Sequence, residues 1–404
     1  MSASNANTNR GGNIVTSRST RAMRRSNNRN SYNIRRELSS TLSGRLERRH
    51  FRDEWIDSQH DLNVVVALVT KKDPSLKHIK IIQTFHGTLD ISRFLDVLSE
   101  SSQVETVAFV GVNMDDEYSI KLATAISSSK SSLSCLQLCR IIPSGLAKLC
   151  PALSTSHSLK ELRLTFNHDL SKSNTALLMS NLGGSQVLEI LKLYCIDLDN
   201  NETTSMVANA VKSAKSLTDL RITSCNLSDI TCLVDAIQGV NRLERVDLSM
   251  NRISDFAPIA KLWECKTITF LSLSQNELGA QELGSSRENT LWKERQRHFD
   301  CLANNCTLKK MYLDMNPLNQ DHVELLTNAL QQNTTLMRLG LLTLTISHDA
   351  LRRIRYLISL NSAGRGRIQH GFPDQRLMPH LLARFSKEPH LIYGLLTQTP
   401  HAWM

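Results

Sequence analysis

One spacing of apolar residues recurs along this chain and restricts the folds open to it. In the segment LERVDLSMNRI, apolar side chains stand at Leu243, Val246, Leu248 and Ile253, and Asn251 lies between the last two. The same spacing recurs in three further segments, LTDLRITSCNL from Leu217, ITFLSLSQNEL from Ile268 and LKKMYLDMNPL from Leu308. A spacing that returns at near-regular intervals predicts a stack of similar units rather than one globular core.

Within each unit the pattern predicts a short strand. In LERVDL, Val246 and Leu248 would point inward, while Arg245 and Asp247 would point outward. The polar slot at Asn251 needs a side chain that hydrogen-bonds the backbone of the turn after the strand, because buried amides and carbonyls would otherwise lack partners. The same slot is filled by Asn167, Cys225, Asn276 and Asn316.

This pattern resembles the leucine-rich-repeat template, L-x-x-L-x-L-x-x-N/C-x-L. Units start at Leu76, Val104, Leu133, Leu159, Leu188, Leu217, Leu243, Ile268, Leu308 and Leu336. The expected fold is an α/β solenoid (a horseshoe) of about ten units over residues 76–346, with a parallel sheet on the concave side and helices on the convex side. Residues 51–75 are expected to form an N-terminal cap and residues 347–404 a helical C-terminal cap.

Helical segments with apolar residues at three-and-four spacing lie between the expected strands. They are Tyr118–Ser128, Asn174–Leu182, Thr203–Ser213 and His322–Gln332. Repeat units in which a strand and a helix alternate in this way resemble the ribonuclease-inhibitor-like class of leucine-rich repeats. That class includes the Ran GTPase-activating protein. That resemblance implies a fold and a binding role, but it identifies no functional residue. The shorter units from Leu217 and Leu243 leave room for only a short helix or irregular turns.

Two stretches depart from the template. The unit from Ile268 carries about a dozen extra residues. Two interpretations of them remain open, an insertion used in binding and an extended helix with Trp292 and Phe299 packed inward. The C-terminal phrases LNSAGRGR and MPHLLARFSKEPHLIYGLL resemble the ends of leucine-rich-repeat proteins of diatoms, which implies no activity. Within them, GRGR at Gly364 to Arg367 is interpreted as a flexible basic linker.

The net charge of +10 comes mainly from the N-terminus. Residues 1–36 hold eight Arg and no Lys, Asp or Glu, so the rest of the chain carries 10 − 8 = +2. Residues 1–50 are expected to be a disordered Arg/Ser/Asn-rich tail, because they contain too few apolar residues to offset the entropy of ordering. A solvated tail, an organelle-targeting peptide and a segment that binds nucleic acid or an anionic membrane all remain open.

The nine Cys are scattered over residues 135–306 without a C-x-x-C pair. Such cysteines are expected to pack as small apolar side chains, which favours a reducing compartment, cytoplasm or nucleus. No apolar run is long enough to span a membrane. No phosphate-binding loop, zinc-type His and Cys spacing or hydrolase motif is present, so no catalytic residue, cofactor or metal is expected.

The outward strand positions are the candidate binding residues, and they fall into three rows across the sheet. The middle row lies between the second and third template apolars, the leading row two residues earlier and the trailing row two residues later. A partner protein with an acidic surface would meet a mixed basic and aromatic face. The candidate residues are Arg163, Phe166, Lys192, Tyr194, Arg221, Arg245, Asp247, Phe270 and Tyr312. Alternatively, Glu161 and Asp219 neutralise the cations, and the face is merely solvated.

The sequence therefore predicts a non-enzymatic scaffold or recognition module that binds a partner protein on the concave face. One alternative is a regulator of a small GTPase that supplies residues from the solenoid rim. Another is association with nucleic acid through the basic tail, which would depend strongly on salt and disappear when residues 1–50 are deleted.

Overall fold

The computed structural model describes residues 54–83, 88–139, 143–165, 172–240, 242–280, 289–342 and 347–366, together with Tyr393 and Thr397. Contacts within the chain separate Met1–Phe51 from Arg52–Met404, and every described residue belongs to the second unit. The predicted tail over residues 1–50 and most of the predicted C-terminal helical region therefore lie outside the described residues.

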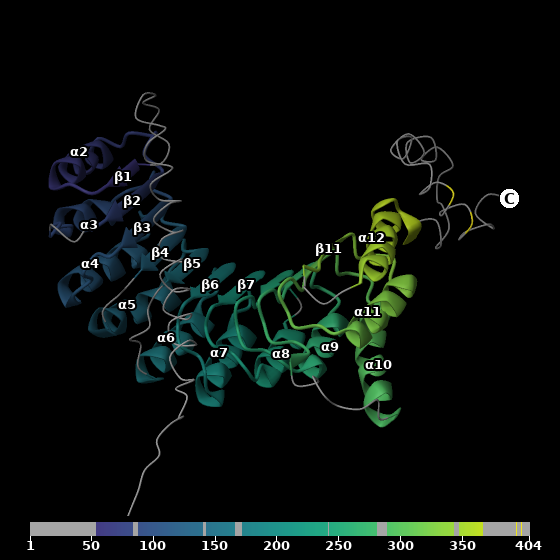
Figure 1. Ribbon diagram of the computed structural model, residues 1–404. Helices are drawn as coiled ribbons and strands as arrows, with labels where there is room; N and C mark the ends of the chain where they lie inside the picture. The colour runs from purple at the N-terminus through teal and green to yellow at the C-terminus, as the bar shows by residue number, and fades with distance from the viewer. Residues whose placement is uncertain are drawn as a thin grey trace, which may run out of the picture. The chain divides into compact units, whose positions relative to one another are not determined.

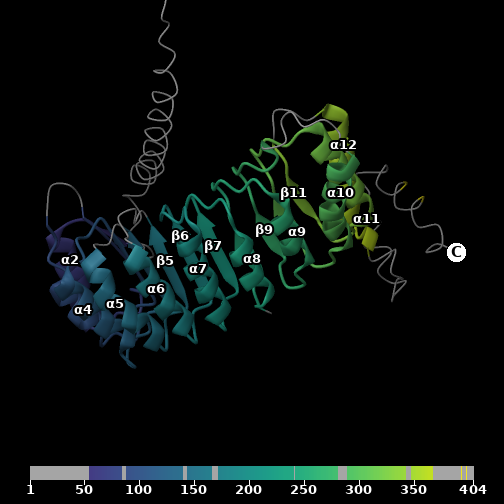
Figure 2. The ribbon, with the colours of Figure 1, turned by 90° about the horizontal axis from the view of Figure 1, so that it is seen from below.

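The described strands form one parallel sheet of eleven strands, whose order in space is their order in the chain. Figures 1 and 2 show the strands side by side, with helices along one side of the sheet. This confirms the predicted α/β leucine-rich-repeat architecture, and β1 adds a strand from the segment expected to be the N-terminal cap. The strands are β1 (Glu54–Ile56), β2 (His78–Ile82), β3 (Thr106–Val110), β4 (Cys135–Cys139), β5 (Glu161–Thr165), β6 (Ile190–Tyr194), β7 (Asp219–Thr223), β8 (Arg245–Asp247), β9 (Phe270–Ser272), β10 (Lys310–Tyr312) and β11 (Arg338–Gly340).

The four helices predicted from three-and-four spacing are present as α4, α6, α7 and α11. The units from Leu217 and Leu243 contain the short helices α8 and α9, as their length predicts. The helices are α2 (Gln59–Thr70), α3 (Ser92–Leu98), α4 (Asp116–Ser127), α5 (Pro143–Thr155), α6 (Lys172–Gly184), α7 (Asn201–Ser213), α8 (Thr231–Gln238), α9 (Phe256–Glu264), α10 (Asn289–Asn304), α11 (Gln320–Gln332) and α12 (His348–Ser362).

The core is a single apolar layer between the sheet and the helices. Inward strand residues such as Val246 and Leu248 are fully buried, together with helix residues such as Ile259 and Trp263. In the longest unit, α10 buries Phe299 and packs the partly buried Trp292 against the same layer. The extended-helix interpretation of that unit therefore holds for residues 289–304. Because each unit buries its apolar side chains only against its neighbours, stability depends on the stack.

The side chain of Asn251 supplies the turn after β8 with the hydrogen bonds that the template predicts. Its Nδ2 donates to the carbonyls of Ile222 at 2.7 Å and Leu248 at 3.0 Å. Its Oδ1 accepts from the backbone N–H groups of Cys225 at 2.9 Å and Leu227 at 3.2 Å. Asn251 thus joins two successive units through groups that are buried from water. Asn276 and Asn316 make equivalent bonds one and two units further on.

A second set of buried amides, which the template does not mark, lies at the C-terminal ends of α10, α11 and α12. Asn305 Nδ2 donates to Trp263 O at 2.6 Å, and Asn333 Nδ2 donates to Asn305 O at 2.9 Å. Asn361 Nδ2 donates in turn to the carbonyls of Asn333 and Leu336, both at 2.9 Å. These three residues link the last units of the described sheet in series.

The residue just before the asparagine slot adopts a left-handed backbone conformation in successive units. The residues at this position are Gly111, Cys195, Ser224, Met250, Gln275 and Met315, with φ between 53° and 69°. A non-glycine residue in this region costs about 1–2 kcal/mol. The asparagine bonds beside it hold the turn in this shape.

We expect the change Gln275→Gly to raise the free energy of unfolding by about 0.5–1 kcal/mol, because φ is 56° and the side chain is exposed. Gln331→Gly, at an exposed position inside α11, should instead lower it by about 1 kcal/mol. Urea denaturation of the two variants checks this contrast. A loss of stability at Gln275 would show that its side chain, rather than its backbone, matters there.

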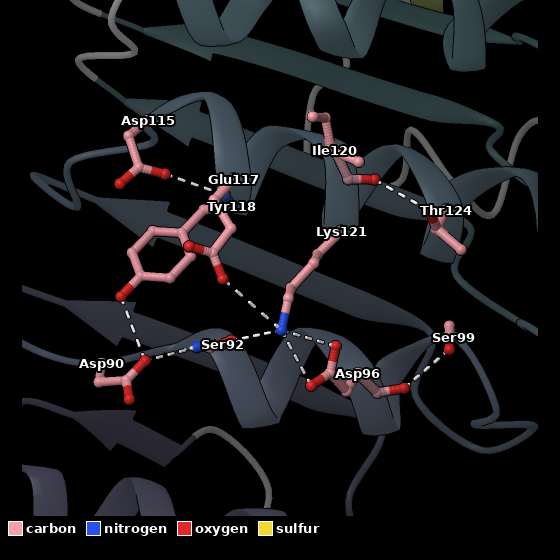
Figure 3. Close-up of polar contacts among 10 residues, drawn as sticks. All are labelled: Asp90, Ser92, Asp96, Ser99, Asp115, Glu117, Tyr118, Ile120, Lys121 and Thr124. Atoms are coloured by element: carbon pink, nitrogen blue, oxygen red, sulfur yellow. Dashed lines mark hydrogen bonds and ion pairs between the residues drawn. The ribbon is translucent and has the colours of Figure 1, made fainter.

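Polar contacts on the outer side of the stack hold neighbouring helices in register. Lys121 on α4 pairs with Asp96 on α3 at 3.0 Å and with Glu117 at 3.9 Å, and it also donates to Ser92 (Figure 3). Tyr118 Oη donates to Asp90 Oδ1 at 3.2 Å. These ties fix how one helix sits on the next.

The described part of the C-terminal region begins with α12, which packs against α11. The prediction that GRGR is a flexible linker is wrong for Gly364 to Gly366. Arg365 is fully buried, and its guanidinium donates to Leu330 O at 2.8 Å and Asn333 O at 2.5 Å at the end of α11. A Cβ on Gly366 would lie 2.7 Å from Thr334 Oγ1, so only glycine fits at this position.

Candidate protein-binding face

The strand register brings the predicted outward residues into three continuous rows on the face opposite the helices, which we call the open face. The middle row runs through directly paired residues from β2 to β11, in the order that the repeat spacing predicts. Its members are Lys80, Ala108, Gln137, Arg163, Lys192, Arg221, Asp247, Ser272, Tyr312 and Gly340. Residues from distant parts of the chain thus form one surface.

Two of the candidate cations share one carboxylate. Glu161 Oε1 lies 2.6 Å from Arg163 Nε and 2.6 Å from Lys192 Nζ, and only 14% of the Glu161 side chain is exposed. Burial alone would raise the pKa of Glu161, but the hydrogen bonds from Arg163 and Lys192 outweigh burial and lower the pKa from 4.5 to about 2. The carboxylate therefore stays ionised and bound to both cations at neutral pH.

The next two cations share a second carboxylate. Asp219, with 7% of its side chain exposed, accepts from Arg221 Nε at 2.9 Å and from Arg221 NH2 at 2.6 Å. Arg245 Nε lies 3.3 Å from the same carboxylate. Four of the predicted cations are therefore held by two acidic residues, as the solvated-face alternative requires for β5 to β8.

We expect the Glu161 pairs to make stability depend on pH. Because the folded pKa lies below the ordinary value of 4.5, their contribution is complete above about pH 4.5 and is lost as the pH falls toward 2. Glu161→Gln should lower the free energy of unfolding by about 2–3 kcal/mol at pH 7, and by much less at pH 2.5.

Urea denaturation at the two pH values measures this difference. Glu105→Gln, which removes the exposed Lys77–Glu105 pair, is the matched control and should show a much smaller pH-dependent difference, because water screens that pair. A Glu161→Gln difference that is equal at both pH values would contradict the ion-pair explanation.

Aromatic side chains follow the ion pairs on the open face. The Arg245 guanidinium lies 4.1 Å from the centre of the Phe270 ring, and the Phe270 and Tyr312 rings lie 5.6 Å apart at 45°. Asp247 is held locally, because its Oδ1 accepts from Ser249 N at 3.1 Å and from Ser249 Oγ at 2.5 Å. Contacts therefore connect three predicted residues, Arg245 on β8, Phe270 on β9 and Tyr312 on β10.

The remaining predicted residues are less central. Tyr194 lies in the trailing row at the end of β6, opposite Thr223, and burial raises the pKa of its hydroxyl. Phe166 lies outside the described residues.

Sequence reasoning did not select two exposed cations of the leading row, Lys310 on β10 and Arg338 on β11. The register pairs them directly with each other and places Lys310 next to Phe270. Neither forms an ion pair with any residue that the structure describes. The leading row as read from the sequence already contained Lys310, and reading it on to the last strand would have added Arg338.

The cysteines contribute to packing. All nine are free thiols, and Cys225, which takes the asparagine slot, donates weakly from Sγ to Thr223 O at 3.2 Å. Burial raises the pKa of Cys150 and of Cys225 to about 12, which disfavours the reactive thiolate. Across the described ranges, no cluster of three or more His, Cys, Asp or Glu residues could hold a metal ion. Within the same ranges, no helix has the length and apolar character needed to cross a bilayer.

Comparisons with known proteins add little to this geometry. Neither a protein-family model nor a curated protein matches the sequence. Among solved structures, the chain is similar to an internalin from Listeria monocytogenes with 18% sequence identity and a TM-score of 0.39. The match covers 70% of this chain and 78% of the internalin.

Proposed function

We propose that this protein is a non-enzymatic recognition module that binds a partner protein on the open face of its sheet. The observation that supports the proposal most is the continuous row of outward side chains from β2 to β11. A solenoid exposes such a row as one extended surface, and leucine-rich repeats commonly use it for binding. Aromatic and arginine side chains, which often anchor protein interfaces, lie in its β8–β10 part.

The ion pairs support a preorganised surface. Arg163, Lys192, Arg221 and Arg245 are each held by a carboxylate, so a partner would meet side chains whose positions are already restricted. Restricting a side chain before binding reduces the entropy lost when the complex forms. The proposal also places the protein in a reducing compartment, the cytoplasm or the nucleus. The nine free thiols support this placement.

Photo-crosslinking from single positions tests the proposal. A benzoylphenylalanine would replace Gln137 or Tyr312 on the open face, and Ile120 or Leu177 on the helix side, where both side chains are exposed. We expect the same partner protein, identified by mass spectrometry, to be crosslinked from both open-face positions and from neither helix position.

Crosslinking from the helix side alone would overturn the proposal. Faster GTP hydrolysis by a small GTPase in the presence of the protein would contradict its non-enzymatic part and favour a regulator instead.

A charge reversal at Arg163 and Arg221 is a poor test of the same idea. It would place new carboxylates beside Glu161 and beside the buried Asp219. Unpaired buried charge is strongly destabilising, so loss of binding in that double variant would not be separable from loss of folding.

A further inference from the structure

The open face carries a distinct group of side chains at its C-terminal end, which we call the β8–β11 patch. It consists of Arg245, Phe270, Lys310, Tyr312 and Arg338. Three register pairs on adjacent strands connect it: Arg245 pairs with Phe270, Phe270 with Lys310, and Lys310 with Arg338. Neighbouring strands are about 4.8 Å apart, so the Phe270 ring lies between two closely spaced cations, Arg245 and Lys310, and Arg338 follows on the next strand.

The aromatic part of the patch is a preformed platform. Phe270 contacts the Arg245 guanidinium on one side and Tyr312 on the other, at 4.1 Å and 5.6 Å between centres. Both ring side chains are partly exposed. A ring held between two neighbours loses little freedom on binding and can take an apolar or aromatic side chain of a ligand.

Gly340 keeps one side of this platform open. A Cβ on Gly340 would lie 2.1 Å from Asp314 Oδ2 and 2.6 Å from Tyr312 Cδ1, so any larger residue would displace the side chains of Asp314 and Tyr312. The adjacent apolar side chains of Met315 and Leu342 are 59% and 63% exposed. The patch therefore has an apolar border beside its charged row.

The charge of the patch differs from that of the rest of the open face. From β5 to β8, Glu161 and Asp219 each hold two cations. On β10 and β11, Lys310 and Arg338 are exposed and form no ion pair with any described residue. A ligand that brings carboxylates can therefore gain interactions here without breaking an existing pair.

We infer that the β8–β11 patch binds an acidic, extended segment of the partner protein. Carboxylates of the segment would pair with Lys310 and Arg338, and a neighbouring apolar or aromatic side chain would stack on Phe270 and Tyr312. The inference rests on the proposed function and names the chemistry of its partner. The N-terminal residues 1–36 of the chain itself carry eight Arg and no acidic residue, so they have the wrong charge for this patch.

A single-stranded nucleic acid fits the patch less well. Asp247 lies two strands before Tyr312 in the middle row, and Asp314 lies two residues beyond the end of β10. Both carboxylates are held in place by hydrogen bonds, Asp314 Oδ1 accepting from Leu342 N at 2.8 Å. A phosphodiester chain carries a charge at every nucleotide and would meet these carboxylates, whereas a peptide can place its acidic residues away from them.

Fluorescence anisotropy with the full chain tests the inference. The probe is a fluorescein-labelled peptide of about 12 residues that alternates Glu and Leu around a central Phe, a length suited to an extended strand-like segment. We expect Lys310→Glu with Arg338→Glu to raise its Kd at least about tenfold, because both changes place like charges opposite the ligand.

A matched double variant controls for net charge. Lys215→Glu with Lys266→Glu makes the same change at two exposed lysines in helix-to-strand turns, and it should alter the Kd less than about twofold. Thermal unfolding of both double variants checks that they fold. Phe270→Ala should raise the Kd of this peptide by a larger factor than it raises the Kd of a control peptide in which Ala replaces the central Phe.

Several results would overturn the inference. They are no binding of the peptide by the unchanged protein, an equal loss in both double variants, and tighter binding of single-stranded oligothymidine that Lys310→Glu with Arg338→Glu abolishes. If the β8–β11 patch does not bind the acidic peptide while crosslinks to a partner still form at Gln137, the proposed function stands without this assignment. If crosslinks form only on the helix side, both fail.

Discussion

Replacing Asn251 by Ala is expected to lower the free energy of unfolding by about 3–4 kcal/mol, the larger of the two strongest effects foreseen for this chain. The change removes donors to the carbonyls of Ile222 and Leu248 and the acceptor for the N–H groups of Cys225 and Leu227. These groups lie in a buried turn, where each unsatisfied partner costs about 1–3 kcal/mol unless the backbone shifts to recover it.

Urea denaturation followed by circular dichroism measures this loss. Arg252→Ala changes the next residue, whose side chain is exposed, and should cost less than about 0.5 kcal/mol. Asn251→Asp keeps an acceptor but loses the donors, so it should also be strongly destabilising. A loss below about 1 kcal/mol for Asn251→Ala would mean that the turn finds other partners.

Replacing Arg365 by Ala is expected to lower the free energy of unfolding by about 3 kcal/mol, through a lost buried hydrogen-bond pair and a cavity. The guanidinium donates to Leu330 O and Asn333 O, and burial lowers its pKa, as expected for a cation that has no carboxylate partner among the described residues. The side chain thus closes the C-terminal end of α11. Removing a desolvated cation offsets part of this loss.

The comparison of Arg365→Ala with Arg353→Ala isolates this role. Arg353 is exposed on α12, so its change to Ala should lower the free energy of unfolding by less than about 0.5 kcal/mol. Arg365→Lys keeps the charge but has one nitrogen in place of the planar fork, so it should fall between the two. Equal thermal unfolding of the Arg365 and Arg353 variants would show that the buried contacts of Arg365 do not stabilise the packing of α12 on α11.

The repeat spacing predicted the fold and the rows of the open face because both depend on sequence separation alone. Once Val246 and Leu248 point inward, the alternation of a strand sends Arg245 and Asp247 outward, and the unit spacing sets which residues become neighbours. Whether Asp219 neutralises Arg245 or leaves it available to a partner could not be decided from the sequence, because that pairing depends on side-chain conformation rather than on spacing.

Other features escaped prediction for identifiable reasons. Arg365 stands in a glycine-rich basic phrase whose composition suggests a linker, and only the packing against α11 shows that its charge is buried. Asn305 and Asn333 lie three residues before the start of the next unit and Asn361 lies 28 residues after Asn333, all outside the template, although their regular spacing was available as a signal. The left-handed turn at Met250 was missed because methionine seldom adopts that conformation.

The strictly sequential order of the eleven strands also determines how the protein can come apart. Each strand pairs only with its predecessor and its successor in the chain, so contact order is low and no pairing ties the first units to the last. Opening can therefore start at an end and advance one unit at a time, and amide hydrogen exchange need not reflect a single global transition. The β8–β11 patch includes the last strand of the described sheet. A ligand that binds there would oppose the opening of that end, and the opening of that end would in turn weaken its binding.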